Sequence, residues 1–300
     1  AATLLRFYQR SGARRLAQSS GILRLFRLQQ TESLAPQIED DFFFRELGNS
    51  FPAEGARRAR VAFLAGCIAS VAFAELNRAT IRVLQKNGVE VWVPEAQGCC
   101  GALHVHAGLQ AEAQQLARQN IHAMLASDVD AIVTNAAGCG TTLKEYGALL
   151  AADPAFAARA GEFAARVRDV NEFLAALGAR PPARTLAARV TYQDPCHLAH
   201  GQRVRSAPRE LLRLIAPNFV EMPRADSCCG SAGIYNIAQN ELSMQILDTK
   251  MNDVAATQAE ILATANVGCM LQLRAGIARR GLNIQVRHVM ELLDDACRGA

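Results

Sequence analysis

The stretch of sequence that decides the fold is Gln97-Gly98-Cys99-Cys100-Gly101, whose Cys-Cys-Gly core returns as Cys228-Cys229-Gly230. Cys67 precedes the first pair, and Cys196 precedes the second pair at the same interval (99 − 67 = 228 − 196). One constant offset therefore superimposes three cysteines of one copy on three of the other. Because equal spacing in two parts of a chain is the signature of a repeat, the sequence predicts two copies of one structural unit.

A fourth cysteine completes each copy. Cys139 follows Cys100, and Cys269 follows Cys229 at an interval that is longer by a single position, so one inserted residue restores the alignment. The offset of the first three cysteines also pairs residues around them: Val61 with Val190, Val91 with Val220, and Pro94 with Pro223. Of the nine cysteines, Cys297 alone lies outside the repeat. So regular a placement argues against cysteines that merely fill a core.

Strands and helices alternate in both copies. The first copy has β-rich apolar runs at 61–65, 89–93 and 131–134, separated by helical stretches at 74–86 and 108–126. The second repeats this with strands at 190–192, 219–222 and 261–263 and a helix over 240–253. This alternation predicts an α/β fold: two tandem, pseudo-symmetric parallel α/β modules with a helical N-terminal extension. We expect the extension at 1–57 and the modules at 58–180 and 181–300.

The composition is that of a globular protein. The 300 residues are 50% apolar and 20% charged, with a net charge of +4. Extended disorder is excluded, and a charge excess this small and dispersed indicates no nucleic-acid partner. No apolar run reaches the ~18 to 20 residues that cross a bilayer. Because no secretory signal precedes the cysteines, we expect a reducing, cytoplasmic compartment.

The N-terminal extension is basic. No acidic residue precedes Glu32, whereas six arginines do: Arg6, Arg10, Arg14, Arg15, Arg24 and Arg27. Three interpretations stay open: a solvated linker helix, a surface that docks on a membrane or partner, and a targeting segment. Three consecutive phenylalanines, Phe42 to Phe44, are available to anchor the extension on the first module.

Each predicted cysteine loop follows a strand, so the sulfur atoms of one copy are expected to gather at the carboxyl edge of its sheet. The candidate metal ligands are Cys67, Cys99, Cys100 and Cys139 in the first copy, and Cys196, Cys228, Cys229 and Cys269 in the second. Side chains of adjacent residues diverge, so a vicinal pair suits two irons of one cluster better than one tetrahedral zinc. Zinc and a strained vicinal disulfide remain as alternatives.

Glycines and histidines accompany the cysteines in both copies. Five glycines bracket them and let the backbone approach a cofactor closely, with amides free to point at cluster sulfurs: Gly98, Gly101, Gly138, Gly230 and Gly268. His104 and His197 follow cysteines, as do His106 and His200. We expect them to hydrogen-bond around the cofactor, with direct ligation or proton donation to a quinone as alternatives. His122, His288 and Cys297 receive no role.

The Cys-Cys-Gly repeat resembles the CCG cysteine-rich domain family, which includes the B subunit of heterodisulfide reductase. Four longer segments are similar to the iron–sulfur subunits of glycolate oxidase: residues 97–104, 135–140, 194–202 and 228–236. That resemblance covers about residues 5–298.

The sequence departs from the family in two respects. The ferredoxin-like domain that precedes the repeat in such subunits is absent from this chain, so we expect part of a longer subunit or a variant without that domain. Thr142 and Gln272 stand where heterodisulfide reductases double the last ligand, which leaves four thiolates per copy.

The resemblance implies an electron-transfer subunit of a flavin-linked dehydrogenase for glycolate or D-lactate. It implies one iron–sulfur cluster per module, with [4Fe–4S] expected although four thiolates suit [2Fe–2S] equally. FAD would lie in partner subunits of a glycolate oxidase complex, since no G-x-G-x-x-G follows a strand here. Electrons would pass to a quinone or another membrane-associated acceptor, with the protein on the cytoplasmic face of the inner membrane. A heterodisulfide-reductase-like thiol–disulfide or quinone reductase, and an assembly scaffold, remain alternatives.

Overall fold

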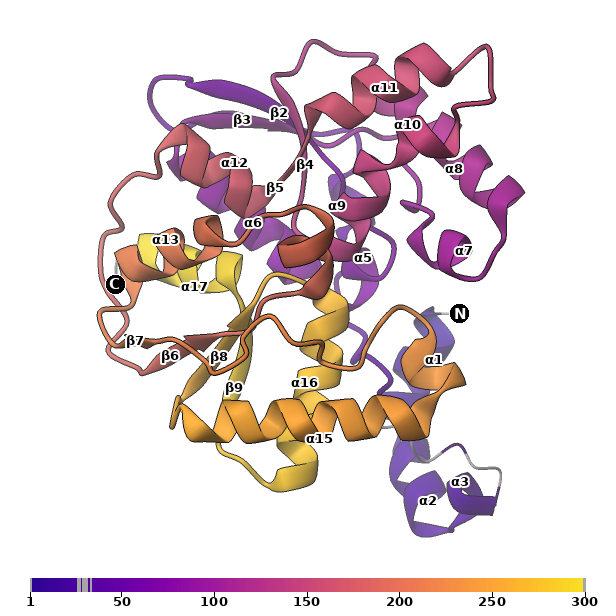
Figure 1. Ribbon diagram of the computed structural model, residues 1–300, viewed down its shortest axis with the longest axis vertical. Helices are drawn as coiled ribbons and strands as arrows, with labels where there is room; N and C mark the ends of the chain where they lie inside the picture. Colours follow the sequence, from indigo (N-terminus) through magenta and orange to yellow (C-terminus); the bar gives the residue numbers. More distant parts are fainter. Residues whose placement is uncertain (1, 26–27, 29–31, 33, 299–300) are drawn as a thin grey trace.

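The computed structural model describes residues 2–25, 28, 32 and 34–298 (Figure 1). Arg27 and residues 26, 29–31 and 33 of the predicted extension lie outside this description. The first sheet has the order β1-β3-β2-β4-β5, with strands at Ser50–Phe51 (β1), Ala59–Phe63 (β2), Val89–Trp92 (β3), Ala131–Thr134 (β4) and Val167–Asp169 (β5). The second has the order β7-β6-β8-β9, with strands at Val190–Tyr192 (β6), Phe219–Val220 (β7), Ile261–Thr264 (β8) and Gln285–His288 (β9).

The two sheets share one topology. The order β3-β2-β4-β5 of the first corresponds strand by strand to β7-β6-β8-β9 of the second, and all these pairings are parallel. Val61 pairs with Ala131 and Val190 pairs with Ile261, so the two central strand pairs match as well. The exception is β1, which adds to β3 in antiparallel register. The predicted pair of parallel α/β modules is thus confirmed.

Helices surround both sheets. In the first module they are α5 (Ala69–Ala72), α6 (Ala74–Lys86), α7 (Ala102–His106), α8 (Gln110–Met124), α9 (Ala137–Lys144), α10 (Tyr146–Leu149), α11 (Ala157–Arg166) and α12 (Val170–Leu177). In the second they are the π-helical turn η2 (His197–Gly201), α13 (Ser206–Ile215), α14 (Tyr235–Ala238), α15 (Asn240–Ala256), α16 (Val267–Arg280) and α17 (Val289–Cys297). The helix expected over 108–126 begins later, because α7 forms a separate turn before it.

The last helix of each module begins in the same way. Asp169 caps α12 by accepting the amide hydrogen of Asn171 at 2.8 Å, and Glu172 completes the capping box. His288 caps α17 through Nδ1, which accepts from the amide of Met290 at 3.1 Å. Both capping residues are the last residue of the strand that precedes the helix, so the repeat extends to the boundaries of these helices.

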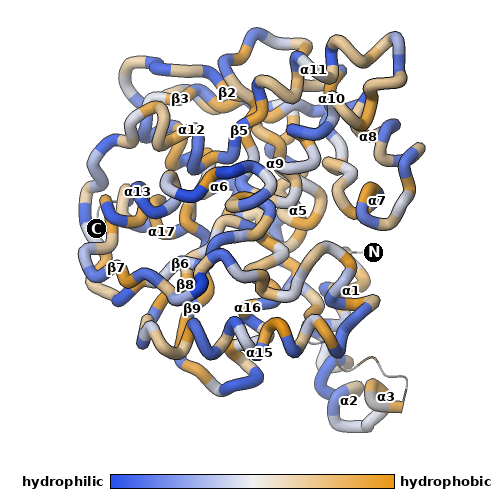
Figure 2. Tube along the Cα trace, viewed as in Figure 1, coloured by the Kyte–Doolittle hydropathy of each residue, from blue (hydrophilic) through white to orange (hydrophobic). Residues whose placement is uncertain are grey.

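One apolar core joins the modules. Val61 and Val133 of the first sheet and Val190 and Leu262 of the second belong to it, and all four are buried. Helices α6, α12, α13 and α17 lie between the two sheets, with α6 packed on α17 and α12 on α13 (Figure 1). The modules therefore stabilise each other through a shared hydrophobic layer. On the far side of the second sheet, α15 carries both hydrophobic and hydrophilic residues along its length (Figure 2).

The N-terminal extension contains α1 (Ala2–Arg10), α2 (Ala13–Ser19), α3 (Ile22–Leu25) and the 3-10 turn η1 (Phe43–Glu46). Phe43 is fully buried and meets the ring of Phe63 edge-on, with centroids 6.1 Å apart. Phe42 and Phe44 meet each other edge-on at 6.2 Å, so of the three phenylalanines Phe43 is the buried anchor. In the part of the chain described, no helix combines the length and apolar character needed to span a bilayer.

Candidate functional site

All eight cysteines of the repeat line one cavity of about 450 Å³ between the modules. Sequence reasoning predicts a separate cluster pocket in each copy and does not predict that the two sets open onto a common space. The cysteine loops of both modules follow the carboxyl ends of strands, and these loops meet at the boundary between the modules. There the amide of Ala137, at the start of α9, donates to the carbonyl of Ala265, just before α16, at 3.3 Å. The two cysteine quartets thereby share one chamber.

The first quartet is arranged as two pairs of sulfur atoms. Sγ of Cys67 lies 3.5 Å from Sγ of Cys99, and Sγ of Cys100 lies 3.1 Å from Sγ of Cys139. Each member of the vicinal pair thus contacts a different cysteine outside the pair. All four are free thiols, with neither distance near the ~2 Å of a disulfide.

The thiols of each quartet differ in how readily they ionise. Interaction with the thiols of Cys100 and Cys67 lowers the pKa of Cys99. In the second copy, Cys196 and Cys229 lower the pKa of Cys228 in the same way. Interaction with Cys229 also lowers the pKa of Cys269. Thiolates are the form that binds metal, so both quartets contain a cysteine that suits this role.

The fourth cysteine of each copy lies in the first turn of a helix. Cys139 lies in α9 and Cys269 in α16, whereas the sequence predicts loops at both positions. A helix N-terminus presents free amides and a partial positive charge, which favours an anionic thiolate or cluster. Asn266 precedes α16 and forms hydrogen bonds with both modules. Its Nδ2 donates to Sγ of Cys269 at 3.4 Å, and its Oδ1 accepts from the amide of Gly138 at 3.3 Å.

The glycines after the vicinal pairs adopt left-handed backbone. Gly101 has φ +80° and Gly230 has φ +91°, and their amides donate to Sγ of Cys99 at 3.5 Å and of Cys228 at 3.3 Å. Each amide thus points at the sulfur of a candidate ligand. The other three glycines divide: Gly138 and Gly268 line the cavity, and the amide of Gly98 donates to Asn120 outside it.

Of the four histidines that follow cysteines in the sequence, two line the cavity and two do not. His106 and His197 line the cavity and stack on each other across the module boundary, with ring centroids 5.5 Å apart and planes at 28°. Burial lowers the pKa of His197, and His106 nearby adds to this. His104 is not part of the lining, and its Nδ1 is buried with no hydrogen-bond partner in the described part of the chain. His200 contacts Arg205 and the carbonyl of Asp226 on the outside.

Sequence reasoning missed the residues that support the cysteine loops from behind. In the first module, Asn120 donates to the carbonyl of Cys99 at 2.9 Å, and the hydroxyl of Tyr146 donates to the carbonyl of Cys100 at 2.8 Å. In the second, Lys250 donates to the carbonyls of Arg224 and Ala225 at 2.8 and 3.2 Å. The alignment that places Cys139 on Cys269 also places Asn120 on Lys250 (269 − 139 = 250 − 120), so the repeat is a usable signal for them.

The lining of the cavity is apolar. Among the described residues that line it are Leu34, Ile68, Leu103, Ile234 and Ile237, and none is Asp, Glu, Lys or Arg. Within the same described residues, no three His, Cys, Asp or Glu side chains are spaced to hold a single metal ion together. The donor set is eight thiols in two quartets, each with amides directed at sulfur, and this is the chemistry that iron–sulfur clusters require. The residues present therefore fit such clusters.

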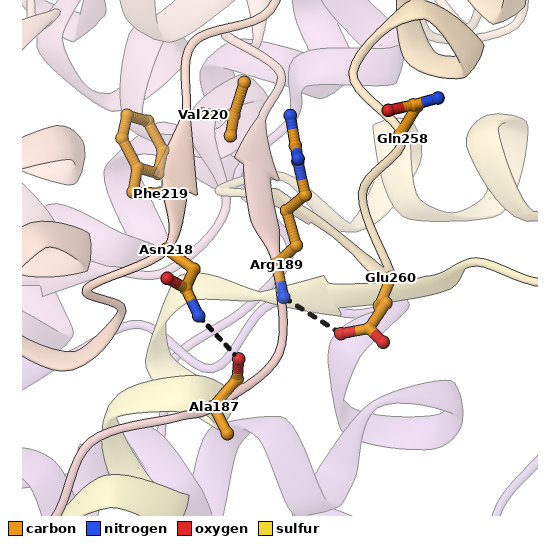
Figure 3. Close-up of a pocket in the computed structure, with 7 residues that line it drawn as sticks. All are labelled: Ala187, Arg189, Asn218, Phe219, Val220, Gln258 and Glu260. Atoms are coloured by element: carbon orange, nitrogen blue, oxygen red, sulfur yellow. Dashed lines mark hydrogen bonds between the residues drawn. The ribbon is translucent and has the colours of Figure 1, made fainter.

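A second hollow, of about 440 Å³, lies away from the cysteines (Figure 3). It is found at the amino ends of β6 and β7, where Asn218 donates to the carbonyl of Ala187 at 2.9 Å and Glu260 accepts from the amide of Arg189 at 2.9 Å. Ligands of parallel sheets gather at the opposite, carboxyl ends, where the cysteines lie. We therefore assign the site to the chamber between the modules.

Comparison with known proteins agrees with this site. A model of the CCG family, described as cysteine-rich domain, matches residues 61–144 and 190–274. A second model, described as glycolate oxidase iron-sulfur subunit, linker region, matches residues 1–35. The matched cysteine-rich regions contain all eight cavity cysteines. The chain is thus a CCG cysteine-rich domain protein with two copies of the domain.

Similar curated proteins indicate which members of the CCG family this chain resembles. The "Probable glycolate oxidase iron-sulfur subunit" of Bacillus subtilis is 43% identical, over 99% of this chain and 68% of the relative. The "Lactate utilization protein A" of Geobacillus kaustophilus is 32% identical, over 78% of this chain and 98% of the relative. The "Glycolate oxidase iron-sulfur subunit" of Escherichia coli is 33% identical, over 79% of this chain and 58% of the relative. The chain belongs to the family of glycolate oxidase iron–sulfur subunits.

Among solved structures, a hypothetical protein from Helicobacter pylori is similar in fold. It superimposes with a TM-score of 0.60 at 12% identity, over 86% of this chain and 54% of that one. At that identity the match concerns the arrangement of helices and strands alone. It supports the α/β architecture described above.

Proposed function

We propose that this chain is the electron-transfer subunit of a flavin-linked dehydrogenase for glycolate or a related 2-hydroxy acid. The observation that carries the proposal is the shared chamber. Because both cysteine quartets line one cavity of about 450 Å³, two clusters held there would lie close enough to exchange electrons directly. A relay needs redox centres in proximity and a dry surrounding, and the apolar lining supplies the latter.

The oxidation of the hydroxy acid belongs to another subunit. A carboxylate substrate calls for a cationic or strongly donating partner, and the described lining of the chamber contains no Arg or Lys. The names of the relatives associate them with glycolate oxidase and lactate utilisation. We therefore place the flavin and the hydride chemistry in partner subunits, and a quinone-type acceptor downstream.

The chain's own residues would hold and tune two clusters, one per module. Cys67, Cys99, Cys100 and Cys139 would bind the first, and Cys196, Cys228, Cys229 and Cys269 the second. The bound clusters supply one-electron redox chemistry. The amides of Gly101 and Gly230 and the side chain of Asn266 donate to cysteine sulfurs, and such hydrogen bonds raise a cluster's reduction potential. The expected type is [4Fe–4S].

The test is partner-dependent dye reduction. Purified chain, loaded anaerobically with iron and sulfide, is mixed with glycolate and an artificial electron acceptor, with and without the flavin-binding subunits. We expect reduction through this chain only when those subunits are present. Cys229→Ser should abolish it, whereas Cys297→Ser, which changes the cysteine outside the repeat, should leave it unchanged. Reduction by the chain alone would contradict a pure relay role.

One observation favours a second candidate, a thiol–disulfide or quinone reductase acting at its own cluster. Cys67 is exposed, and the apolar residues Ile68, Leu103 and Ile234 at the chamber are each about 40% exposed, so a small apolar acceptor has access. A subunit of the fumarate reductase (CoM/CoB) of Methanothermobacter marburgensis is a relative at 32% identity over 79% of this chain and 46% of its own. Acceptor reduction by a chemically reduced, isolated chain, lost in Cys67→Ser, would select this candidate.

A further inference from the structure

The second cysteine quartet has a buried cation behind it. The side chain of Lys250, on α15, is 1% exposed, and its Nζ donates to the carbonyls of Arg224 and Ala225. Those carbonyls belong to the segment that leads directly into Cys228 and Cys229. Burial lowers the pKa of Lys250, whereas Asp253 and the nearby Cys229 oppose that shift. The two hydrogen bonds hold the ammonium group of Lys250 against the loop that carries the vicinal pair.

The first quartet has a neutral residue in the equivalent place. Helices α8 and α15 correspond, because a Cβ on Gly101 would meet Ala113 of α8 and one on Gly230 would overlap the carbonyl of Ser243 of α15. The alignment that places Ala113 on Ser243 also places Asn120 on Lys250 (243 − 113 = 250 − 120). Asn120 accepts from the amide of Gly98 at 2.8 Å and donates to the carbonyl of Cys99. Both residues brace the loop before the vicinal pair, but Lys250 alone adds a charge.

The carboxylates that act on Lys250 are each paired with an arginine. Asp226 is paired with Arg205 at 3.2 Å, and Asp253, on the same helix as Lys250, is paired with Arg224 at 2.7 Å. Asp194 is held by Arg209 through two hydrogen bonds of 2.8 and 2.6 Å. In the first module, the side chains behind the vicinal pair are neutral. They are the hydroxyl of Tyr146 and the side-chain amide of Asn120, which lie 3.1 Å apart.

We propose that Lys250 raises the reduction potential of the cluster held by the second quartet above that of the first, and so directs electrons from the first module to the second. This inference rests on the proposed relay function. A buried positive charge stabilises the added electron, and net charge is one of the factors that set the potential of a cluster. The step is the loss of one electron at the first site and its gain at the second, with no bond made or broken.

The test is a redox titration of the cluster-loaded chain, followed by electron paramagnetic resonance. We expect two titrating signals, of which the one with the higher potential is lost in Cys229→Ser and the other in Cys100→Ser. Lys250→Gln and Lys250→Met should each lower the higher reduction potential by about 59 mV. For one electron, this shift corresponds to a tenfold change in the equilibrium constant for reduction of the cluster. The lower potential should stay unchanged. Lys250→Arg keeps the charge and should retain the potential of the wild type.

The outcomes separate this inference from the function on which it rests. Iron and sulfide are measured in every variant first. A wild-type chain that binds no cluster overturns the proposed function itself. Clusters that are present, but whose higher potential is the same in Lys250→Gln, overturn the role of Lys250. Assignment of the higher potential to the first quartet overturns the direction, and an equal shift in Lys250→Arg overturns the role of charge.

Discussion

The two glycines that follow the vicinal cysteine pairs offer a matched test of the fold. Gly101 and Gly230 occupy equivalent positions with left-handed backbone, at φ +80° and +91°. A Cβ on Gly101 would lie 3.5 Å from Cα of Ala113, an ordinary contact, whereas a Cβ on Gly230 would overlap the backbone carbonyl of Ser243. Alanine costs about 1–2 kcal/mol at either position from the backbone conformation alone. At Gly230 overpacking adds about 1–3 kcal/mol more.

We therefore expect Gly230→Ala to destabilise the protein by about 2–5 kcal/mol and Gly101→Ala by about 1–2 kcal/mol. The assay is thermal unfolding of the cluster-loaded protein, with iron content measured on the same samples. Each kcal/mol corresponds to a shift of about 2–4 °C in the Tm of a chain somewhat shorter than this one. Equal shifts in the two variants, or a larger shift in Gly101→Ala, would refute the reasoning.

Two further predictions concern the module interface. Arg82 of α6 donates to both carboxylate oxygens of Asp294 on α17, whose side chain is 2% exposed. Because Arg298 also pairs with Asp294 at 2.8 Å and remains in Arg82→Ala, we expect this variant to cost about 2 kcal/mol in a urea unfolding experiment. Arg166→Ala, which removes the surface pair with Glu162, should cost about 0.5 kcal/mol or less, and a similar loss in both variants would contradict the argument. His288 donates through Nε2 to the carbonyl of Asn135 at 2.9 Å, and burial lowers its pKa from 6.5 to about 4. The stability it contributes is complete above pH 6.5 and falls by about 3 kcal/mol as the pH drops from 6.5 to 4, because the unfolded state takes up the proton first. His288→Gln should therefore lose less stability than the wild type between about pH 7 and 4. Parallel pH profiles would be inconsistent with a buried neutral histidine, since the opposite effect of Asp169, whose pKa burial raises to about 6, is common to both proteins.

The sequence alone predicts the repeat and the central strands because both depend on local patterns. The runs at 131–134 and 190–192 coincide with β4 and β6, since short apolar segments bounded by polar residues are distinctive. The sequence patterns do not reveal the strands β5 and β9. Each runs directly into a helix of its own module, β5 into α12 and β9 into α17, so the helical pattern that follows obscures the short strand.

What the sequence does not predict is how the copies face each other. The common chamber depends on α6 packing against α17 and on the contact of α9 with η2, which are tertiary contacts between residues far apart in the chain. The supporting residues escape prediction for a related reason. Asn120 and Lys250 lie on helices and look like ordinary polar positions, and their direction toward the cysteine loops becomes evident only when α8 and α15 are packed.

The most direct test of one cluster per module is the content of iron and acid-labile sulfide per chain, measured anaerobically on the wild type and on Cys100→Ser, Cys229→Ser and Cys297→Ser. We expect iron with matching sulfide in the wild type, loss of about half in each of the first two variants, and no loss in the third. Zinc in place of iron, iron without sulfide, or a complete loss in either single variant would contradict one iron–sulfur cluster in each module.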